Sequence, residues 1–243
     1  MKHETLVPVL AEALEAHGGV DRWRTFEQLS STIVTGGALW GLKGVEMPPI
    51  PRRVATDLRR QRASFTPFIE PASTMVWTPE RVVIQQASDI VGERFSPRES
   101  FAGHLLETPW DLLQLAYFQG YAMWTYHSLP FLLADPGFEV REIEPVEDRG
   151  ETLRGVSARF PDGIHSHSRV QRFYFGADGL LKRHDYDVEI SGGTSAAHYV
   201  SDYVELDGFR FPGRREVFVR AADGSVSRDF FVVEVDLSDY RLR

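Results

Sequence analysis

The stretch from Ile164 to Gly208 constrains the fold of this chain more than any other. Three runs rich in β-favouring residues follow one another, separated by short links that contain Asp178-Gly179 and Gly192-Gly193. Alternating runs of this length indicate β-strands, and a short glycine-containing link between two of them indicates a hairpin. Four of the eight histidines also fall in this stretch. We therefore expect an antiparallel sheet that carries several imidazole groups.

The same strand pattern continues through most of the chain. Further strands are expected at residues 26–40, 53–65, 75–77, 81–85, 138–145, 152–160, 209–221 and 227–237. The polar segment 88–103 is predicted to be a loop. The sequence lacks alternating strands and helices, a GxGxxG motif and a phosphate-binding loop, which disfavours a nucleotide-binding α/β fold. The fold class that follows is mainly β, with one wide, curved antiparallel sheet of about nine to eleven strands.

Two segments have helical patterns instead. Residues 5–17 are amphipathic and end before Gly18, which predicts an N-terminal helix. The sequence TPWD at 108–111 has the form of a capping box, so we expect Thr108 to cap a second helical segment. Gly120 and Pro130 are expected to divide this segment into about two helices and a tail.

The second segment is apolar on all sides, because Asp111 is its one charged residue between positions 110 and 133. Such a helix must be covered by other apolar groups. It forms either a helix pair in the core or a lid whose inner face contacts a ligand. A membrane-docking helix is disfavoured, because the segment lacks the Lys and Arg residues that such helices carry. We interpret Asp111 as part of the helix start rather than as an acid catalyst. The aromatic residues that a lid would present to a ligand are Trp110, Tyr117, Tyr121, Trp124 and Tyr126.

Composition excludes several classes of function. With no cysteine, the chain has no disulfide, no thiolate metal site and no cysteine nucleophile. Its net charge of −8 argues against a nucleic-acid partner, which needs a basic surface. Residues 1–19 contain one lysine and three interrupting glutamates, so no signal peptide is recognised, and a cytoplasmic protein is expected. No run reaches the roughly 18 apolar residues of a membrane-spanning helix.

The order of the elements and two short motifs resemble the LolA/LolB-like lipoprotein-carrier superfamily. The motifs are His17-Gly18-Gly19 followed by Trp23, and the hairpin sequence FYF at 173–175 followed by DGLL at 178–181. The resemblance implies a single domain over residues 1–243, built as a half-barrel with a helical lid at about 108–133. It also implies an apolar cavity suited to acyl chains or other hydrophobic molecules. The cofactor-free enzyme VioE of violacein biosynthesis is similar in scaffold, so the resemblance is compatible with chemistry as well.

The alternation of side chains along a strand allows the central runs to be oriented. If Phe175 pairs with Leu180, then Gln171 faces His184 and Arg169 faces Tyr186. The other face of residues 180–190 is mainly charged, so the face with the imidazoles is predicted to be the inner one. The polar residues expected together on this inner face are His165, His167, Arg169, His184 and Tyr186.

Two registers are compatible with the third run. A plain turn after Ser191 would place Tyr199 on the inner face, whereas a bulge at Gly192-Gly193 would place His198 there. The apolar residues at 200, 204 and 206 share the parity of His198, which favours His198.

Three interpretations of this polar cluster stay open. The side chains can satisfy one another as part of the core. They can also perform acid–base catalysis, in which His and Tyr exchange protons with a bound ligand and Arg169 stabilises a developing oxyanion. A metal site of His165, His167 and His184 lacks a completing carboxylate, and we assign neither a metal nor a cofactor. The candidate catalytic residues are His165, His167, His184, Tyr186 and His198.

The leading prediction for function is binding of a hydrophobic small molecule or lipid between the sheet and the lid. The five aromatic residues of the lid and Arg169 are its expected ligand contacts. The alternative is a cofactor-independent isomerase, cyclase or hydrolase that uses the His and Tyr residues. No serine lies in a nucleophile motif such as GxSxG, and we interpret Arg210, Arg214 and Arg215 as surface charges.

Overall fold

The computed structural model describes residues 6–228 and 231–243. Within them, thirteen antiparallel strands form one sheet with the order β6-β5-β4-β3-β2-β1-β13-β12-β11-β10-β9-β8-β7. The strands are β1 (Gln28–Gly36), β2 (Arg52–Asp57), β3 (Ala63–Thr66), β4 (Ser73–Trp77), β5 (Arg81–Gln86), β6 (Asp89–Phe95), β7 (Glu139–Asp148), β8 (Glu151–Arg159), β9 (Val170–Phe175), β10 (Leu181–Val188), β11 (Thr194–Leu206), β12 (Phe209–Val219) and β13 (Val233–Leu242). The mainly β, curved antiparallel architecture is confirmed, with more strands than expected.

Four α-helices and three 3-10 turns accompany the sheet in the described residues. The α-helices are α1 (Pro8–Ala16), α2 (Val20–Trp23), α3 (Leu39–Leu42) and α4 (Leu112–Ser128). The 3-10 turns are η1 (Pro97–Phe101), η2 (Phe131–Ala134) and η3 (Glu189–Ser191). The predicted N-terminal helix is confirmed as α1, although residue 5 lies outside the described residues.

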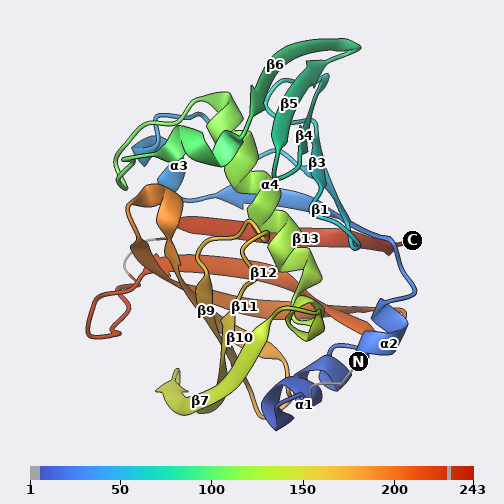
Figure 1. The fold of residues 1–243 in the computed structure, drawn as a ribbon, viewed down its shortest axis with the longest axis vertical. Coiled ribbons are helices and arrows are strands. Elements are labelled where there is room, and N and C mark those ends of the chain that lie inside the picture. Colours follow the sequence, from blue (N-terminus) through green and yellow to red (C-terminus); the bar gives the residue numbers. More distant parts are fainter. Residues whose placement is uncertain (1–5, 229–230) are drawn as a thin grey trace.

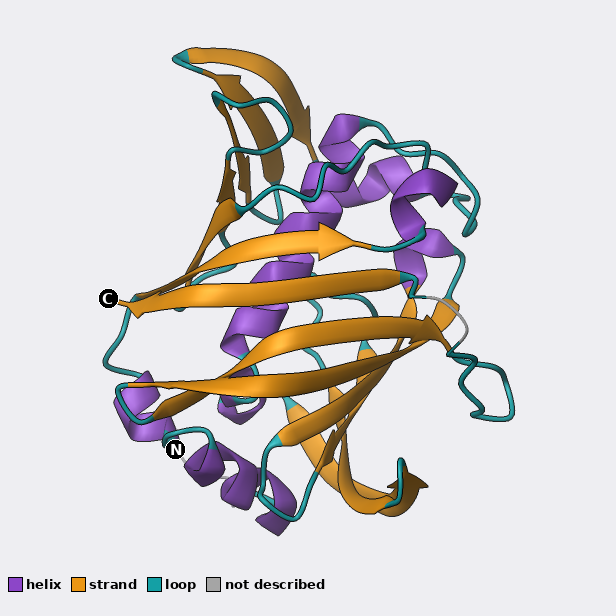
Figure 2. Ribbon diagram, turned by 180° about the vertical axis from the view of Figure 1, so that it is seen from behind, coloured by secondary structure: helices purple, strands orange, loops and turns teal. Residues whose placement is uncertain are grey.

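The strand order shows how the chain builds a half-barrel. It enters the sheet at β1 in the middle, adds neighbouring strands out to the edge strand β6, and then crosses the sheet through α4. It resumes at the other edge with β7 and returns strand by strand to β13, which pairs with β1. Figure 1 shows α4 lying across one face of the curved sheet, and Figure 2 shows the strands from behind with α4 on the far side.

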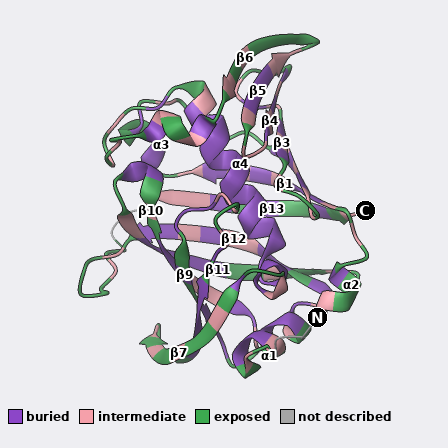
Figure 3. Cartoon of the chain, in the orientation of Figure 1, coloured by how far each residue is buried: buried purple, intermediate pink, exposed green. Residues whose placement is uncertain are grey.

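Helix α4 occupies the concave interior of the sheet. Every residue from Gln114 to Ser128 is buried, as Figure 3 shows along the length of the helix. This explains the sequence pattern, because a helix surrounded by side chains on all sides needs no polar face. The segment is thus buried as both the core-helix and the lid interpretation require, and it packs against β2 to β6.

Two details of this segment differ from the prediction. The helix cap is Asp111, whose side chain accepts from the Gln114 backbone N–H at 2.8 Å, and not Thr108. The Gln114 side chain returns a bond to the Asp111 backbone N–H, so the capping box lies three residues later than expected. The helix also runs through Gly120 without a break and ends at Ser128, just before Pro130.

Four predicted boundaries in the sheet also need correction. The single strand predicted at 53–65 is a hairpin, in which β2 pairs antiparallel with β3. Segment 88–103 is not a loop throughout, since it contains the edge strand β6. The strand predicted at 26–40 ends at Gly36, where the chain turns into α3. The last strand is Val233–Leu242 rather than 227–237, and residues 229–230 of that prediction lie outside the described residues.

Candidate functional site

A cavity of about 70 Å³ lies between the inner face of the sheet and α4. Four of its polar lining residues, Tyr126, His167, Tyr186 and His198, are buried, and we call the part of the wall that they form the closed end. Other lining residues, among them Leu106 and Thr194, are partly exposed, and we call this part the rim. Most of the remaining wall is apolar, and includes Ile33, Leu39, Trp40, Phe65, Trp110, Phe118, Ala122, Met123, Val217 and Val235. The cavity therefore has an apolar body and a polar closed end.

The hairpin of β9 and β10 supplies part of that closed end, in a register that differs from the predicted one. Phe175 pairs with Leu181 and Phe173 pairs with His184, with an irregularity between Leu181 and Arg183. The predicted pairing of Gln171 with His184 is therefore wrong. The two side chains still meet, because His184 Nε2 donates to Gln171 Oε1 at 2.6 Å.

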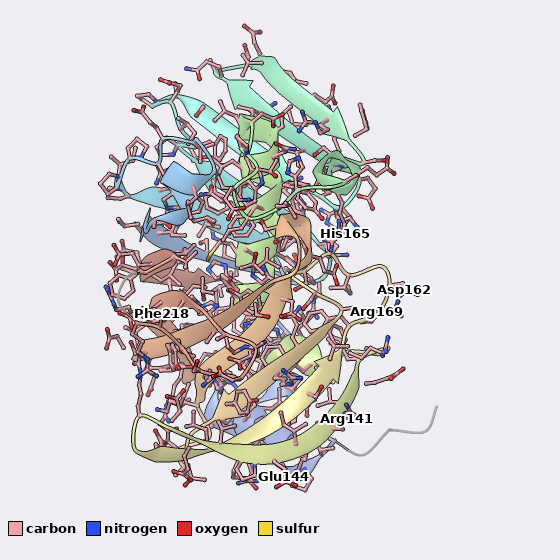
Figure 4. The ribbon with its side chains drawn as sticks, turned by 90° about the vertical axis from the view of Figure 1, so that its left-hand side faces the viewer. Arg141, Glu144, Asp162, His165, Arg169 and Phe218 are labelled. Atoms are coloured by element: carbon pink, nitrogen blue, oxygen red, sulfur yellow. The ribbon has the colours of Figure 1, made fainter. Side chains whose placement is uncertain are left out.

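Arg169 lies outside the interior, contrary to the prediction. It precedes β9, is exposed, and forms an ion pair with Asp162. Figure 4 labels both residues, which lie together at the border of the molecule in this view. The expectation that Arg169 faces Tyr186 failed because the inward alternation does not extend past the start of β9.

His198 is the inward residue of β11, as the parity of the apolar residues indicated. It pairs with His184 across the β10–β11 ladder and is fully buried. Tyr199 points to the other side of the sheet, where its hydroxyl donates to Asp148 Oδ2 at 2.8 Å. The prediction that favoured His198 over Tyr199 is therefore confirmed.

The polar groups at the closed end form a continuous chain of contacts. Guanidinium nitrogen NH1 of Arg215 lies 3.4 Å from His198 Nε2, and His198 Nδ1 lies 3.4 Å from the Tyr186 hydroxyl. The Tyr186 hydroxyl lies 3.3 Å from that of Tyr126, which in turn lies 2.7 Å from His167 Nε2. The chain ends at Tyr121, whose hydroxyl lies 3.2 Å from His167 Nδ1.

Arg215 sets the tautomer of His198 in this chain of contacts. A guanidinium group donates hydrogen bonds and never accepts them, so His198 Nε2 must be the acceptor. A neutral imidazole has one N–H, which places the proton of His198 on Nδ1, where it donates to Tyr186. Beyond Tyr186 either hydroxyl can donate in the contact between Tyr186 and Tyr126, and the contact between Tyr126 and His167 Nε2 depends on the tautomer of His167. The fixed charge of Arg215 thus sets the proton position of His198.

Burial keeps these groups uncharged at neutral pH. Desolvation lowers the pKa of His167 to about 3 and that of His198 well below its usual value. Arg215 adds to the shift of His198, because a second positive charge next to it is unfavourable. Desolvation raises the pKa of Tyr126 to about 12 and that of Tyr186 well above its usual value. The closed end therefore offers neutral donors and acceptors beside one permanent cation.

Arg215 was not recognised from the sequence, where it was interpreted as a surface charge. It is 2% exposed, and its guanidinium lies 4.7 Å from the centre of the Tyr126 ring. The signal was present in β12, since Arg215 has the same parity as the inward residues Phe211 and Val217. The interpretation of Arg210 as exposed agrees with the structure, and Arg214 is half-exposed and ion-paired.

The remaining predicted site residues lie beside the cavity rather than on its wall. His184 is stacked on Phe173 at 4.3 Å between ring centres. His165 is partly exposed, and its Nδ1 lies 3.0 Å from the Tyr117 hydroxyl. Trp124 donates through Nε1 to the Asp57 carbonyl. Among the aromatic residues expected to contact a ligand, Trp110 and Tyr126 line the cavity, whereas Tyr117, Tyr121 and Trp124 do not.

Two further observations concern metals and membranes. In residues 6–228 and 231–243, no three His, Asp or Glu side chains are grouped so that they could hold a metal ion. The set of His165, His167 and His184 considered from the sequence is therefore not brought together. No helix of the described part combines the length and apolarity needed to cross a membrane.

Neither a family model nor a curated protein matches this sequence. Solved structures do match over nearly the whole chain. A LolA superfamily protein from Nitrosomonas europaea is 13% identical, with a TM-score of 0.50 and coverage of 97% of this chain and 92% of that chain. A putative outer membrane lipoprotein-sorting protein domain from Vibrio parahaemolyticus is 11% identical, with a TM-score of 0.53 and coverage of 97% and 91%. Likeness at such identities concerns the fold, and this chain has the LolA-like fold that its sequence motifs implied.

Proposed function

We propose that the protein binds a hydrophobic small molecule or lipid in the cavity between the sheet and α4. The observation that carries the proposal is the apolar wall of this cavity. Such a wall offers a water molecule few hydrogen-bond partners, whereas an apolar ligand needs none. An unfilled apolar cavity of about 70 Å³ costs about 2 kcal/mol of folding free energy. An apolar ligand that fills the cavity would recover much of this cost.

The size of the cavity limits how a ligand can enter. An engineered protein cavity of about 150 Å³ holds one benzene molecule, so about 70 Å³ accepts only a small apolar group. A longer chain must extend past the partly exposed rim at Leu106 and Thr194 or displace side chains there. The likeness to a domain described as lipoprotein-sorting supports a lipid-like ligand by analogy of fold.

Native mass spectrometry of the protein purified without detergent tests the proposal. We expect a small apolar molecule to remain bound at one copy per chain and to be released on denaturation. Ala196 is buried on the cavity wall, so an Ala196→Phe variant should fill the space and lose the bound mass. Its circular dichroism spectrum should match that of the wild type. An adduct of equal abundance in both proteins would place the molecule elsewhere.

A second function, cofactor-independent acid–base catalysis, is favoured by the polar closed end. His167, Tyr186, His198 and Tyr126 reach the cavity wall, where a neutral imidazole can accept a proton and a phenol can return one. Two of the catalytic candidates named from the sequence, His165 and His184, do not line the cavity and are left out of this second proposal.

Profiling a metabolite extract before and after incubation with the protein separates catalysis from binding. An enzyme would deplete one ion and form its product with wild-type protein but not with His198→Gln. A binding protein would leave every concentration unchanged after denaturation and extraction. His184→Gln is the matched control, because His184 is buried beside the same strands but does not touch the cavity. Loss of turnover in both variants would argue for a packing defect.

A further inference from the structure

Arg215 is a buried cation whose charge is not balanced by a carboxylate of the described residues and whose hydrogen bonds are incomplete. Its guanidinium contacts His198 Nε2 at 3.4 Å, donates to the Tyr126 carbonyl at 3.2 Å and lies over the Tyr126 ring. Its Nε is buried and has no hydrogen-bond partner. Within residues 6–228 and 231–243, no carboxylate forms an ion pair with it, since its polar contacts are those just named.

The buried Arg52 and the partly buried Arg183 are compensated differently. Arg52 donates to three backbone carbonyls at 2.7–3.2 Å. Arg183 forms ion pairs with Asp148 and Asp185, at 2.8 and 2.7 Å. A buried charge without a partner is strongly destabilising, and its retention at one site calls for an explanation. An anion that approaches from outside the chain would balance the charge of Arg215.

The cavity provides the route to this charge. Arg215 lies directly behind His198 and Tyr126, which form part of the closed end. In front of them, the Tyr126 and Tyr186 hydroxyls can rotate and donate hydrogen bonds to a ligand. The body of the cavity is apolar and leads from this end to the rim. A molecule that enters with its polar group first would place that group against Tyr126, Tyr186 and His198, one side chain away from the cation, and its tail along the apolar wall.

We propose that the natural ligand is a hydrophobic carboxylate whose carboxylate group sits at the closed end, held by the Tyr126 and Tyr186 hydroxyls, with its negative charge balanced by Arg215 behind His198. This inference rests on the proposed function and adds the chemical class of the ligand. A carboxylate suits the site better than a phosphate, because it is small and planar and the cavity offers about 70 Å³. Charge-assisted hydrogen bonds are about twice as strong as neutral ones, which favours the ionised group over an alcohol.

Isothermal titration calorimetry at neutral pH with octanoate and octan-1-ol tests this inference. Both probes have the same chain length and differ in the polar group. We expect the wild-type protein to bind octanoate more tightly than octan-1-ol, by about tenfold or more. Arg215→Met should abolish the preference while octan-1-ol still binds. Arg215→Lys retains a positive charge and should retain part of the preference.

Arg214→Gln is the matched control, because Arg214 is the next residue of β12 but points outward to Glu234 and Asp236. It should leave the preference unchanged. Equal affinity of the wild type for both probes would overturn the carboxylate inference and leave hydrophobic binding standing. A preference that persists in a folded Arg215→Met protein would overturn it as well. Binding of neither probe, together with no bound molecule in native mass spectrometry, would overturn the proposed function itself. If Arg215→Met does not fold, the wild-type comparison of the two probes still decides.

Discussion

Among residues 6–228 and 231–243, five histidines are buried in an uncharged form. The pKa of His17 is lowered to about 4, and those of His127 and His167 to about 3. The pKa values of His184 and His198 lie well below the usual value. Burial is the main cause in every case, because the low-dielectric interior disfavours the imidazolium ion. His127 is held in this form between the hydroxyls of Ser31 and Thr56, at 3.0 and 2.9 Å.

These histidines make the protein sensitive to acid. Below the unfolded pKa of about 6.5, the unfolded chain binds protons that the folded chain excludes, so stability falls as the pH falls. The loss continues until the folded pKa values are reached, near pH 3 to 4 for the three with values above. Each histidine contributes up to about 1.4 kcal/mol per pH unit in this window. Stability above pH 7 should be nearly independent of these groups.

Urea unfolding at a series of pH values checks this expectation. The unfolding midpoint should fall steadily between about pH 6 and pH 4. His127→Gln should reduce the slope, because glutamine can still bond to Ser31 and Thr56 but does not titrate. His104→Gln is the control, since His104 is only partly buried. A slope that is the same in the wild type and in His127→Gln would contradict this account.

The alternation of side chains along a strand predicted which residues face the interior only where the strands are regular. It placed His198 inside, on the same face as the buried Val200, although Val204 of the same parity is exposed. It failed for Arg169, which precedes β9, and for the pairing of Gln171 with His184, which an irregularity in the ladder shifts. The burial of Arg215 was not predicted, because its charge suggested a surface position although its place in the alternation of β12 indicated an inward one. A long-range contact such as that between Arg215 and Tyr126 leaves no local trace in the sequence.

At the scale of elements, α4 shows that a glycine within a helical pattern can mark a close contact instead of a helix break. Gly120 was predicted to break the helix, yet the helix continues through it. A Cβ atom at this position would lie 2.4 Å from both Cβ and Cγ of Trp77, which is fully buried. Gly120 therefore allows α4 to pack closely against Trp77 of β4. Propensity alone could not distinguish a break from a close contact.

Gly120→Ala should destabilise the protein in spite of the higher helix propensity of alanine. The propensity gain is about 1 kcal/mol, whereas overpacking against a buried side chain costs about 1–3 kcal/mol, and more where the neighbour cannot move. Chemical denaturation should show a net loss of stability. Gly41→Ala in α3 is the matched control, because its Cβ would meet nothing within 4 Å and stability should not fall. A Gly120→Ala protein more stable than the wild type would refute the close contact.

The helix start and the edge strand show two other limits of sequence patterns. Both the TPWD sequence and the pair of Asp111 with Gln114 satisfy a capping pattern, and the structure uses the second. Strand β6 forms the sheet edge and exposes Ile90, Val91 and Phe95, so it lacks the alternation that marks a half-buried strand. Choices of this kind depend on tertiary packing, which a local pattern does not contain.

At the scale of the whole molecule, the fold class and the resemblance were predictable and the cavity was not. The long series of hairpins and the apolar central segment indicated a curved sheet with a covered inner face. The position of α4 across the sheet follows from the strand order, with β6 and β7 at opposite edges. The volume left between α4 and the strands depends on the packing of about twenty-six side chains from distant segments. Residue types alone do not determine such a volume.

The central claim is that an apolar molecule occupies the cavity between the sheet and α4. Intermolecular nuclear Overhauser effects between octan-1-ol and methyl-labelled protein test it most directly. The account predicts contacts to the methyl groups of Met123, Val217 and Val235, which line the cavity. It predicts none to Leu112 and Val170, which are exposed and lie outside it. Contacts confined to the exposed methyl groups, or equal contacts to both sets, would contradict the claim.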